Sequence, residues 1–270
     1  MKLPGTKLYR KLRYRKGFGV HSPFVYNLIT KVIEEKAHYY AFKEIEDFRI
    51  ELLERGDDIA SITRRETQSP AYGAFLFRMV NFFKSENVVQ IGCSTGVMSL
   101  YLIMAASPQT DFYLLEDREN LLNPMERLLL ARNLNGIHVL KGDYRRNIET
   151  GCSKIQKCDM IFINHISKNI HPEDFFHLME PLINDSTVLI IDNIGKNKRK
   201  EKFWQYVRKS SKARITIDLY SSGIIFFDDK YPKRNYKTYF SNGKNIHKNR
   251  RQWLHFSRRR KKSFKSKPSH

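Results

Sequence analysis

The chain has 270 residues, and its 49 Lys and Arg against 28 Asp and Glu leave a formal net charge of +21. This length suits one α/β core with extensions, or at most two small domains. No apolar run approaches the ~20 residues that span a bilayer, and no apolar segment follows the basic start as it does in a signal peptide. The three cysteines have neither paired nor metal-ligand spacing, so we expect a protein of the reducing cytoplasm.

The positive charge lies at the two ends of the chain. Residues 1–21 hold seven Lys and Arg without an acid, and residues 230–270 hold fifteen without an acid. The segment between them, residues 22–229, keeps 27 basic residues against all 28 acids, a net charge of −1. Binding to a polyanion is therefore a hypothesis about the ends, and small-molecule chemistry is a hypothesis about the near-neutral middle.

Two Ser-Pro pairs predict helix starts in the first third of the chain. Ser22-Pro23 and Ser69-Pro70 each combine a hydroxyl N-cap with proline at the first helical position. A periodic apolar pattern over residues 45–53 predicts another helix. We therefore expect a helical region over residues 22–87, preceded by a short basic arm over residues 1–21.

A strand, a glycine turn and a helix follow one another in the stretch VVQIGCSTG, residues 88–96. Strand character ends at Ile91, and an apolar segment of helical period begins at residue 97. Gly92 permits a sharp turn and lets a ligand lie against bare backbone, while the free N–H groups that open the next helix favour an anionic group. The stretch predicts a nucleotide-like ligand, with an ordinary strand-to-helix turn as an equal alternative.

Strands and helices alternate after this turn. Six further strands are predicted, at residues 111–116, 137–141, 159–164, 187–192, 214–220 and 223–228, with helices near 120–133, 172–182 and 200–212. Alternation of this kind predicts a mostly parallel sheet that is covered on both faces. Only two residues separate the last two strands, so these must pair as an antiparallel hairpin.

The predicted fold is therefore a doubly wound α/β fold with a seven-stranded, mostly parallel sheet and one antiparallel strand. This core spans residues 88–229. Apolar periodicity vanishes after it, so residues 230–270 are expected to form a largely disordered basic tail.

Polar residues stand at the ends of four consecutive predicted strands. They are Glu116, Gly142-Asp143, Asn164-His165 and Asp192-Asn193. Ligands of doubly wound sheets bind at the carboxyl ends of the strands, beside the point where the strand order reverses. Four polar ends in a row predict one shared site; solvated strand termini are the alternative.

The order of these features resembles class I S-adenosylmethionine-dependent methyltransferases, over about residues 65–229. DMIFIN at 159–164 and LIIDNI at 189–194 look most like the catechol-type O-methyltransferases. The leader GFGVHSPFVYNLI is similar to that of a group of uncharacterised bacterial methyltransferase-like proteins. The resemblance implies a Rossmann-like methyltransferase fold, an S-adenosylmethionine cofactor and methyl transfer to an oxygen of a small-molecule acceptor.

The resemblance also implies which residues bind the cofactor. Gly92, Ser94 and Gly96 match the cofactor turn. Glu116 matches the acid that accepts hydrogen bonds from both ribose hydroxyls, and Asp143 matches the residue near the adenine. These positions, together with Gln90 before the turn, form the predicted cofactor site.

Two positions depart from the family pattern. Gln90 stands where the family has an acid, so the charge that supports the turn and the ammonium end of the cofactor is missing. Asn164, Asp192 and Asn193 match the divalent-metal ligands, but Asn164 replaces an aspartate. A hard cation would find one formal negative charge, at Asp192, so Mg²⁺ is expected to be weak or absent.

Two residues after the fourth strand are candidates for catalysis. His165 is placed to remove a proton from an acceptor hydroxyl, with a solvated loop histidine as the alternative. The family's catalytic lysine falls at Ser167, and Lys168 follows one place later. We therefore expect His165 or Lys168 to act as the base.

Two other functions compete with methyl transfer. A catalytically degenerate protein of the same fold, bound to nucleic acid or another polyanion through its basic ends, is favoured by Gln90 and Asn164. Cations between residues 230 and 267 are interleaved with aromatic side chains, which suit RNA phosphates and bases. A nicotinamide dehydrogenase needs GxGxxG, whereas Ser94 and Val97 occupy the second and third glycine positions.

Overall fold

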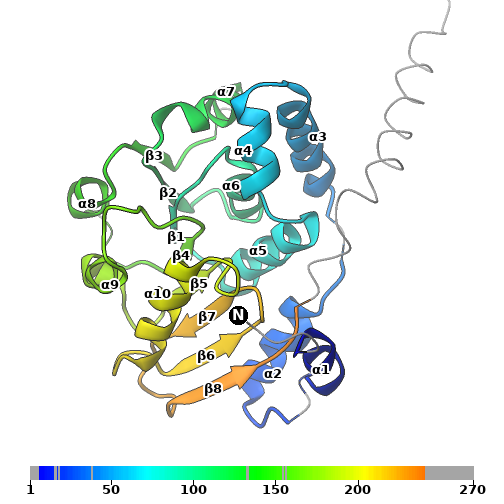
Figure 1. Ribbon diagram of the computed structural model, residues 1–270, viewed down its shortest axis with the longest axis vertical. Coiled ribbons are helices and arrows are strands. Elements are labelled where there is room, and N and C mark those ends of the chain that lie inside the picture. The colour runs from blue at the N-terminus through cyan, green and yellow to red at the C-terminus, as the bar shows by residue number, and fades with distance from the viewer. Residues whose placement is uncertain are drawn as a thin grey trace, which may run out of the picture.

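The computed structural model describes residues 6–14, 17, 19–37, 39–131, 134–153, 155 and 157–240. One eight-stranded sheet runs through the molecule, and helices lie on both of its faces (Figure 1). Among the described residues, no helix is both long and apolar enough to cross a membrane.

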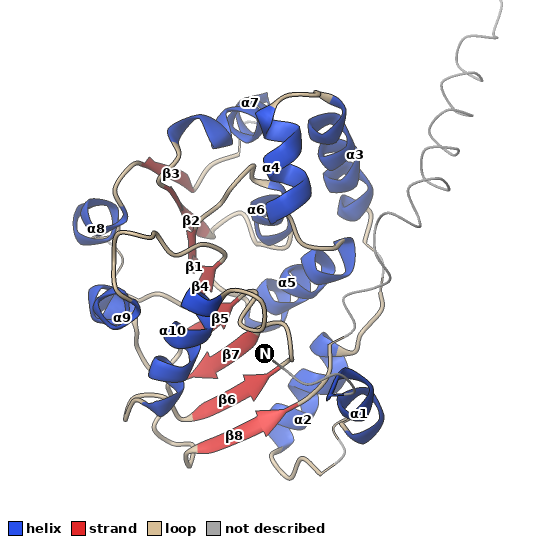
Figure 2. Ribbon diagram, viewed as in Figure 1, coloured by secondary structure: helices blue, strands red, loops and turns tan. Residues whose placement is uncertain are grey.

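The sheet has the strand order β3-β2-β1-β4-β5-β7-β6-β8 (Figure 2). Its strands are β1 (Asn87–Ile91), β2 (Asp111–Glu116), β3 (Ile137–Lys141), β4 (Met160–Ile163), β5 (Val188–Ile191), β6 (Ile215–Asp218), β7 (Gly223–Phe226) and β8 (Arg234–Lys237). Neighbouring strands are parallel except where β7 pairs with β5 and β6. The predicted doubly wound α/β fold and the antiparallel β6–β7 hairpin are confirmed.

The predicted count of seven strands is wrong by one. β8 pairs in parallel with β6, with Arg234 opposite Ile215, and it lies within the segment predicted to be a disordered tail. Three of its four residues are exposed, so β8 has no alternating apolar pattern to predict it. Phe240, a little further on, is buried with its ring 5.2 Å from that of Phe75. The core therefore extends beyond residue 229, and residues 241–270 lie outside the described residues.

Two hydrophobic cores join the helices to the sheet. The helices are α1 (Thr6–Arg13), α2 (Pro23–Leu28), α3 (Ala41–Glu54), α4 (Asp58–Glu66), α5 (Pro70–Phe83), α6 (Val97–Ile103), α7 (Asn123–Ala131), α8 (Tyr144–Arg146), α9 (Pro172–Met179) and α10 (Lys198–Lys209). Short helical turns lie at η1 (Ile29–Ile33), η2 (Glu119–Leu122), η3 (Asn147–Gly151) and η4 (Glu180–Leu182). One core packs α2, α3, α5 and α6 on one face of the sheet, and the other packs α9 and α10 on the opposite face (Figure 1).

Both predicted Ser-Pro helix starts are present. Ser22 Oγ accepts a hydrogen bond from Val25 N at the start of α2, and Ser69 Oγ accepts one from Tyr72 N at the start of α5. α5 is buried along most of its length and leads directly into β1. Local capping chemistry therefore sets where α2 and α5 begin.

The sequence prediction did not include α4. Its sequence, DIASITRRE, is mostly polar, and its buried members are the small residues Ala60 and Thr63, so it lacks a strong apolar stripe. Asp57 caps it by accepting a hydrogen bond from Ala60 N. α4 is held instead by tertiary contacts at the carboxyl edge of the sheet.

The predicted basic arm contains α1, which is docked by an ion pair. Arg10 is buried and donates two hydrogen bonds to Asp218 at the end of β6, over 2.8 and 2.9 Å. Leu8 and Leu12 on the same helix stay 61% and 65% exposed. α1 therefore contacts the sheet through an arginine and not through its leucines.

Candidate active site

The carboxyl ends of β1, β2, β4 and β5 meet where the strand order reverses, between β1 and β4. Gly92 N donates to Leu115 O of β2 over 2.8 Å, and Asn164 N after β4 donates to Ile91 O over 2.9 Å. The turn after β1 is thus held by the strands on both sides. Doubly wound sheets bind their ligands at such a point.

The turn has three residues with positive φ: Gly92 at 79°, Ser94 at 54° and Gly96 at 83°. A Cβ atom on Gly92 would lie 2.2 Å from the Cβ atom of His165, and one on Gly96 would lie 2.3 Å from Met125 Sδ. Both glycines are therefore required by contacts within the protein. The expectation that Gly92 leaves bare backbone for a ligand is corrected here, because the loop after β4 fills that space.

Glu116, at the end of β2, is fully buried beside the turn. Its Oε2 accepts a hydrogen bond from Ser94 N, and its Oε1 accepts from Arg118 N over 3.2 Å and from Arg118 Nε over 2.8 Å. Burial raises the pKa of Glu116, against the lowering effects of Arg118 and of the Ser94 amide. The carboxylate predicted to bind a ribose is thus already engaged by the protein.

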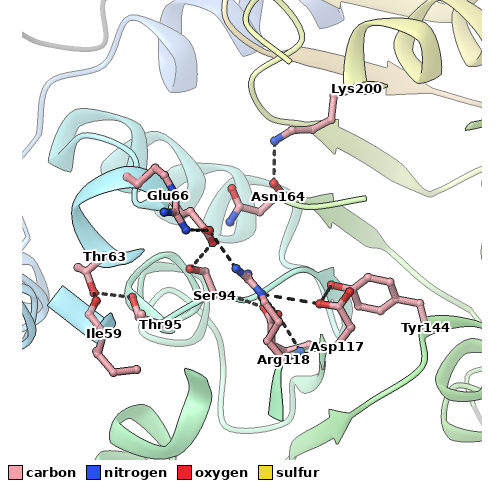
Figure 3. A network of polar contacts seen from close by, with 12 residues as sticks. Ile59, Thr63, Glu66, Ser94, Thr95, Asp117, Arg118, Tyr144, Asn164 and Lys200 are labelled. Carbon is pink, nitrogen blue, oxygen red and sulfur yellow. Dashed lines mark hydrogen bonds and ion pairs between the residues drawn. The ribbon is translucent and has the colours of Figure 1, made fainter. Parts of the chain in front are cut away.

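Arg118 also joins Glu116 to Glu66, the last residue of α4; Figure 3 shows Arg118 directed at Glu66. Arg118 Nη1 donates to Glu66 Oε1 over 2.9 Å, and Ser94 Oγ donates to Glu66 Oε2 over 2.9 Å. Burial by itself raises the pKa of Glu66, but the hydrogen bond and charge of Arg118, with Arg65 and Ser94, lower it to about 2. Two carboxylates and one guanidinium therefore form an ion-pair network over the turn.

α4 makes a second contact with the turn, one helical turn earlier. Thr63 lies three residues before Glu66 and therefore on the same helical face. Its hydroxyl donates to Thr95 Oγ1 over 3.1 Å, and Thr95 is fully buried (Figure 3). The face of α4 that carries Thr63 and Glu66 therefore covers the turn after β1.

Gln90, the next-to-last residue of β1, is fully buried. Neither its amide oxygen nor its amide nitrogen has a hydrogen-bond partner among the described residues. An unpaired buried amide destabilises a fold by roughly 1–3 kcal/mol, so such groups usually serve a bound molecule or an ordered water. Gln90 thus offers an unused donor and an unused acceptor next to the turn.

Asp192, directly after β5, is 1% exposed. Its Oδ2 accepts from Gln68 Nε2 over 2.9 Å and from Asn193 Nδ2 over 3.0 Å, and it lies 3.9 Å from Lys200 Nζ. Lys200 Nζ also donates to Asn164 O over 2.7 Å. Burial raises the pKa of Asp192, and the charge of Lys200 opposes that rise.

The residues predicted to bind a metal lie at adjoining strand ends but do not fit a divalent cation. Two amide NH₂ groups donate to Oδ2 of Asp192 and an ammonium lies 3.9 Å from the same oxygen, so donors already engage one of the two anionic oxygens that these three residues could offer a cation. Asn193 turns its nitrogen toward Asp192, and Asn164 uses its main-chain oxygen to accept from Lys200. In the part of the chain that the structure describes, no group of three or more His, Cys, Asp or Glu residues is arranged to hold a metal.

The remaining predicted residues differ in their burial. His165 is half-buried, and burial lowers its pKa. The side chain of Lys168 is exposed, and its main-chain oxygen accepts from Arg199 Nη2 over 2.9 Å. Asp143 is exposed after β3 and caps α8 by accepting from Arg146 N over 2.9 Å. Of these three candidates, His165 is the one partly withdrawn from solvent.

Three charged residues of this edge are missing from the sequence prediction: Glu66, Arg118 and Lys200. Glu66 lies on the unpredicted helix α4. Arg118 stands two residues after the predicted ribose acid, and this spacing was an available signal. Lys200 lies in the first turn of α10 beside Lys198 and Arg199, so nothing in the sequence distinguishes it from two other cations of that turn.

No family model matches the sequence, and no curated protein sequence matches it either. The sheet order, with one antiparallel strand and a reversal between β1 and β4, is that of a Rossmann-like methyltransferase fold. Solved structures agree. The O-methyltransferase from Bacillus cereus, determined with S-adenosylhomocysteine (SAH), has a TM-score of 0.54 and 19% identity, over 74% of this chain and 94% of that one.

Two further structures have the same fold. TomG, an O-methyltransferase from Streptomyces achromogenes in complex with S-adenosylmethionine (SAM), has a TM-score of 0.54 and 14% identity, over 75% of this chain and 94% of that one. The SAH-bound methyltransferase PaMTH1 from Podospora anserina has a TM-score of 0.57 and 12% identity, over 77% of this chain and 97% of that one. The fold implied by the resemblance is therefore confirmed.

Proposed function

We propose that this protein is an S-adenosylmethionine-dependent methyltransferase that transfers a methyl group to an oxygen of a small-molecule acceptor. One observation carries the proposal: the buried carboxylate of Glu116 ends β2 beside a glycine turn, at the point where the strand order reverses. Nucleotide-like ligands of doubly wound folds bind at this point. Structures of the same fold that were determined with SAM or SAH support it.

The polar groups beside the turn suit this cofactor. Glu116 would accept hydrogen bonds from its ribose hydroxyls, and Asp143 at the end of β3 would lie toward its adenine. The unpaired amide of Gln90 would meet its amino-acid end, because that amide has both a free donor and a free acceptor. When bound, the cofactor supplies a methyl group that its sulfonium already activates.

Arg118 sets a condition for binding. Its guanidinium occupies hydrogen-bonding positions on Glu116, so ribose hydroxyls can take these positions once Arg118 turns away. The Arg118 side chain is 33% exposed and is also paired with Glu66, so it would keep a carboxylate partner after leaving Glu116. We infer that cofactor binding exchanges one partner of Glu116 for another.

We propose that His165 accepts the proton that the acceptor hydroxyl loses during methyl transfer. Burial lowers the pKa of His165, so its imidazole is neutral at pH 7 and can accept a proton from a hydroxyl. Most of the rate acceleration in a methyl transfer comes from holding the acceptor in position, so the base only has to remove one proton. Lys168, exposed three residues later, is the second candidate.

Calorimetric titration of the full chain with SAM, SAH and NAD tests this function before any acceptor is known. We expect SAM and SAH to bind with one site per chain, and NAD to give no heat of binding. Binding of NAD alone would assign a dehydrogenase. Absence of binding by all three would support a catalytically degenerate protein of this fold.

We further propose that the basic end of the chain binds RNA or another polyanion. The support is the charge distribution, with fifteen Lys and Arg and no acid over residues 230–270. Residues 241–270 lie outside the described residues. Retention of the full chain on heparin should be lost when residues 241–270 are removed, and unchanged retention of the shortened chain would rule the idea out. Residues 6–13 should be kept, because Arg10 docks α1 to the sheet.

We also propose a cytoplasmic location. Cys93, Cys152 and Cys158 are all buried and unpaired. Unpaired thiols suit a reducing compartment. Burial raises the pKa of Cys93 well above its ordinary value, so this residue of the turn is a packed side chain and not a reactive thiolate.

A further inference from the structure

Lys200 is a buried cation at the carboxyl edge of the sheet. It is 4% exposed, and its ammonium joins two strand ends by donating to Asn164 O after β4 over 2.7 Å and lying 3.9 Å from Asp192 Oδ2 after β5 (Figure 3 shows the bond to Asn164). Lysine is almost never buried to this degree unless it is paired. The two charges are therefore withdrawn from water together, and each compensates the other.

The stability of α10 does not explain this position. Asn197 Oδ1 caps the helix by accepting from Arg199 N and Lys200 N over 3.0 and 3.1 Å, so Lys200 lies in its first turn. The N-terminal end of a helix carries partial positive charge, so a cation there is unfavourable. The partner that favours Lys200 at this place is Asp192, outside the helix.

We propose that Lys200 is the resident cation of this active site: its ammonium, between the main-chain oxygen of Asn164 after β4 and Asp192 after β5, supplies the positive charge that a divalent metal would bring to these strand ends. Methyl transfer by this protein is therefore metal-independent. Lys200 is a positioning residue, because it holds Asn164, the residue directly before His165, against the end of β5. This inference rests on the proposed function for the reaction that the site serves.

The charges at the site explain why the ammonium and a metal exclude each other. Asp192 carries one negative charge, and Lys200 cancels it. A divalent ion would bring two further positive charges next to an ammonium, and the one carboxylate within 4 Å of that ammonium among the described residues, Asp192, carries a single negative charge. Hard cations require anionic or carbonyl oxygens directed at them, whereas amide NH₂ groups of Gln68 and Asn193 point at Asp192.

Titration of the full chain with Mn²⁺, followed by the electron-spin signal of the free ion, tests the inference. Four proteins are compared: the unchanged chain, Asn164→Asp, Lys200→Gln, and the double variant Asn164→Asp Lys200→Gln. Glutamine at position 200 removes the charge and keeps a donor for Asn164 O. Lys202→Gln is the matched control, because Lys202 lies on the same helix with its side chain exposed. Thermal melts identify the variants that remain folded.

We expect no Mn²⁺ site at this edge in the unchanged chain or in Lys202→Gln, and only weak binding in Asn164→Asp. The double variant should bind one Mn²⁺ per chain, about 10–100-fold more tightly than Asn164→Asp, because a second carboxylate is then present without the ammonium. Adding Asp192→Asn to the double variant should abolish that site.

Two results would overturn the inference. The first is a one-to-one Mn²⁺ site in the unchanged chain that Asp192→Asn removes. The second is a folded double variant that binds Mn²⁺ no better than Asn164→Asp. If the double variant does not fold, Mn²⁺ titration of the unchanged chain and of Asp192→Asn still tests the inference. SAM titration is independent of this readout, so failure of the proposed function and failure of the role of Lys200 are distinguishable.

Discussion

Arg118 Nε lies 2.8 Å from Oε1 of Glu116, and this ion pair joins a partly exposed guanidinium to a carboxylate with no exposure at all. The acid predicted to bind a ribose is therefore held by a side chain that can reach solvent. The same guanidinium also pairs with Glu66 on α4. Ser94 of the turn after β1 donates hydrogen bonds to both carboxylates, so this ion-pair network covers the turn and governs the behaviour expected of the site.

Replacing Glu116 by glutamine should weaken SAM binding at least tenfold. A carboxylate that accepts hydrogen bonds from hydroxyls in a buried place contributes roughly 1.5–3 kcal/mol per charged bond, and an amide accepts fewer and weaker ones. Calorimetric titration measures the change. Asp111→Asn is the control, because Asp111 lies at the opposite end of the same strand. Undiminished affinity in a folded Glu116→Gln protein would remove Glu116 from the cofactor site.

Replacing Arg118 by methionine should destabilise the protein by roughly 1–3 kcal/mol at pH 7, because Glu116 loses its charged donor and Glu66 loses one of two. The folded-state pKa of Glu66 is about 2, below its ordinary value of 4.5. This depressed pKa contributes stability above pH 4.5 that is lost as the pH falls toward 2. The difference between the two proteins should therefore shrink between pH 5 and pH 2.

Urea unfolding at pH 7, 5 and 3 measures that difference. Arg145→Met is the matched control, since Arg145 pairs with Glu149 over 3.5 Å on an exposed surface. We expect this control to change stability by less than about 0.5 kcal/mol at every pH. A loss for Arg118→Met that is equal at pH 7 and pH 3 would contradict the depressed pKa of Glu66.

Gly92→Ala should destabilise the fold more than Gly56→Ala. Both glycines have positive φ, 79° and 76°, so alanine at either position is destabilising by about 1–2 kcal/mol because of that backbone conformation. A Cβ atom on Gly56 meets nothing within 4 Å, whereas one on Gly92 would lie 2.2 Å from that of His165. The clash should add roughly 1–3 kcal/mol, measured by urea unfolding. If both variants lose the same stability, the loop after β4 moves aside without destabilising the protein, and the expected clash is wrong.

Breaking the ion pair between Arg10 and Asp218 should release α1 from the sheet. Arg10→Met leaves a mostly buried carboxylate without its main partner, and such losses are about 3–5 kcal/mol. The double variant Arg10→Met Asp218→Asn should recover part of this loss. The exposed pair Lys43–Asp47 is the control, with a coupling of about 0.3–0.5 kcal/mol. Double-mutant cycles give both values, and similar couplings would contradict the docking role of Arg10.

The elements of the sheet could be predicted because their signals are local. The strands predicted at 111–116 and 137–141 have the same bounds in the structure, and the two Ser-Pro caps begin α2 and α5. Apolar alternation and capping act between neighbouring residues, so they are visible in the sequence. The parallel arrangement followed from the alternation of strands with helices, since parallel strands need a crossover.

β8 and α4 could not be predicted, because their signals are not local. β8 is an edge strand with exposed side chains that is held by its main-chain pairing with β6. α4 has a polar sequence, and its position depends on Thr63 and Glu66 meeting the turn. Each element is stabilised by a partner distant in sequence, which apolar periodicity does not record.

The candidate site likewise contains some residues that the sequence predicts and others that only the tertiary structure reveals. Glu116 and Asp192 were predicted, because the carboxyl ends of parallel strands share one edge whatever the details of packing. Glu66 and Arg118 are 52 residues apart, and Lys200 is 36 residues from Asn164. A charged residue in a sequence is most often a solvated one. The tertiary structure decides which charged residues are buried and which partner pairs with each of them, because only the folded chain brings these residues within hydrogen-bonding distance.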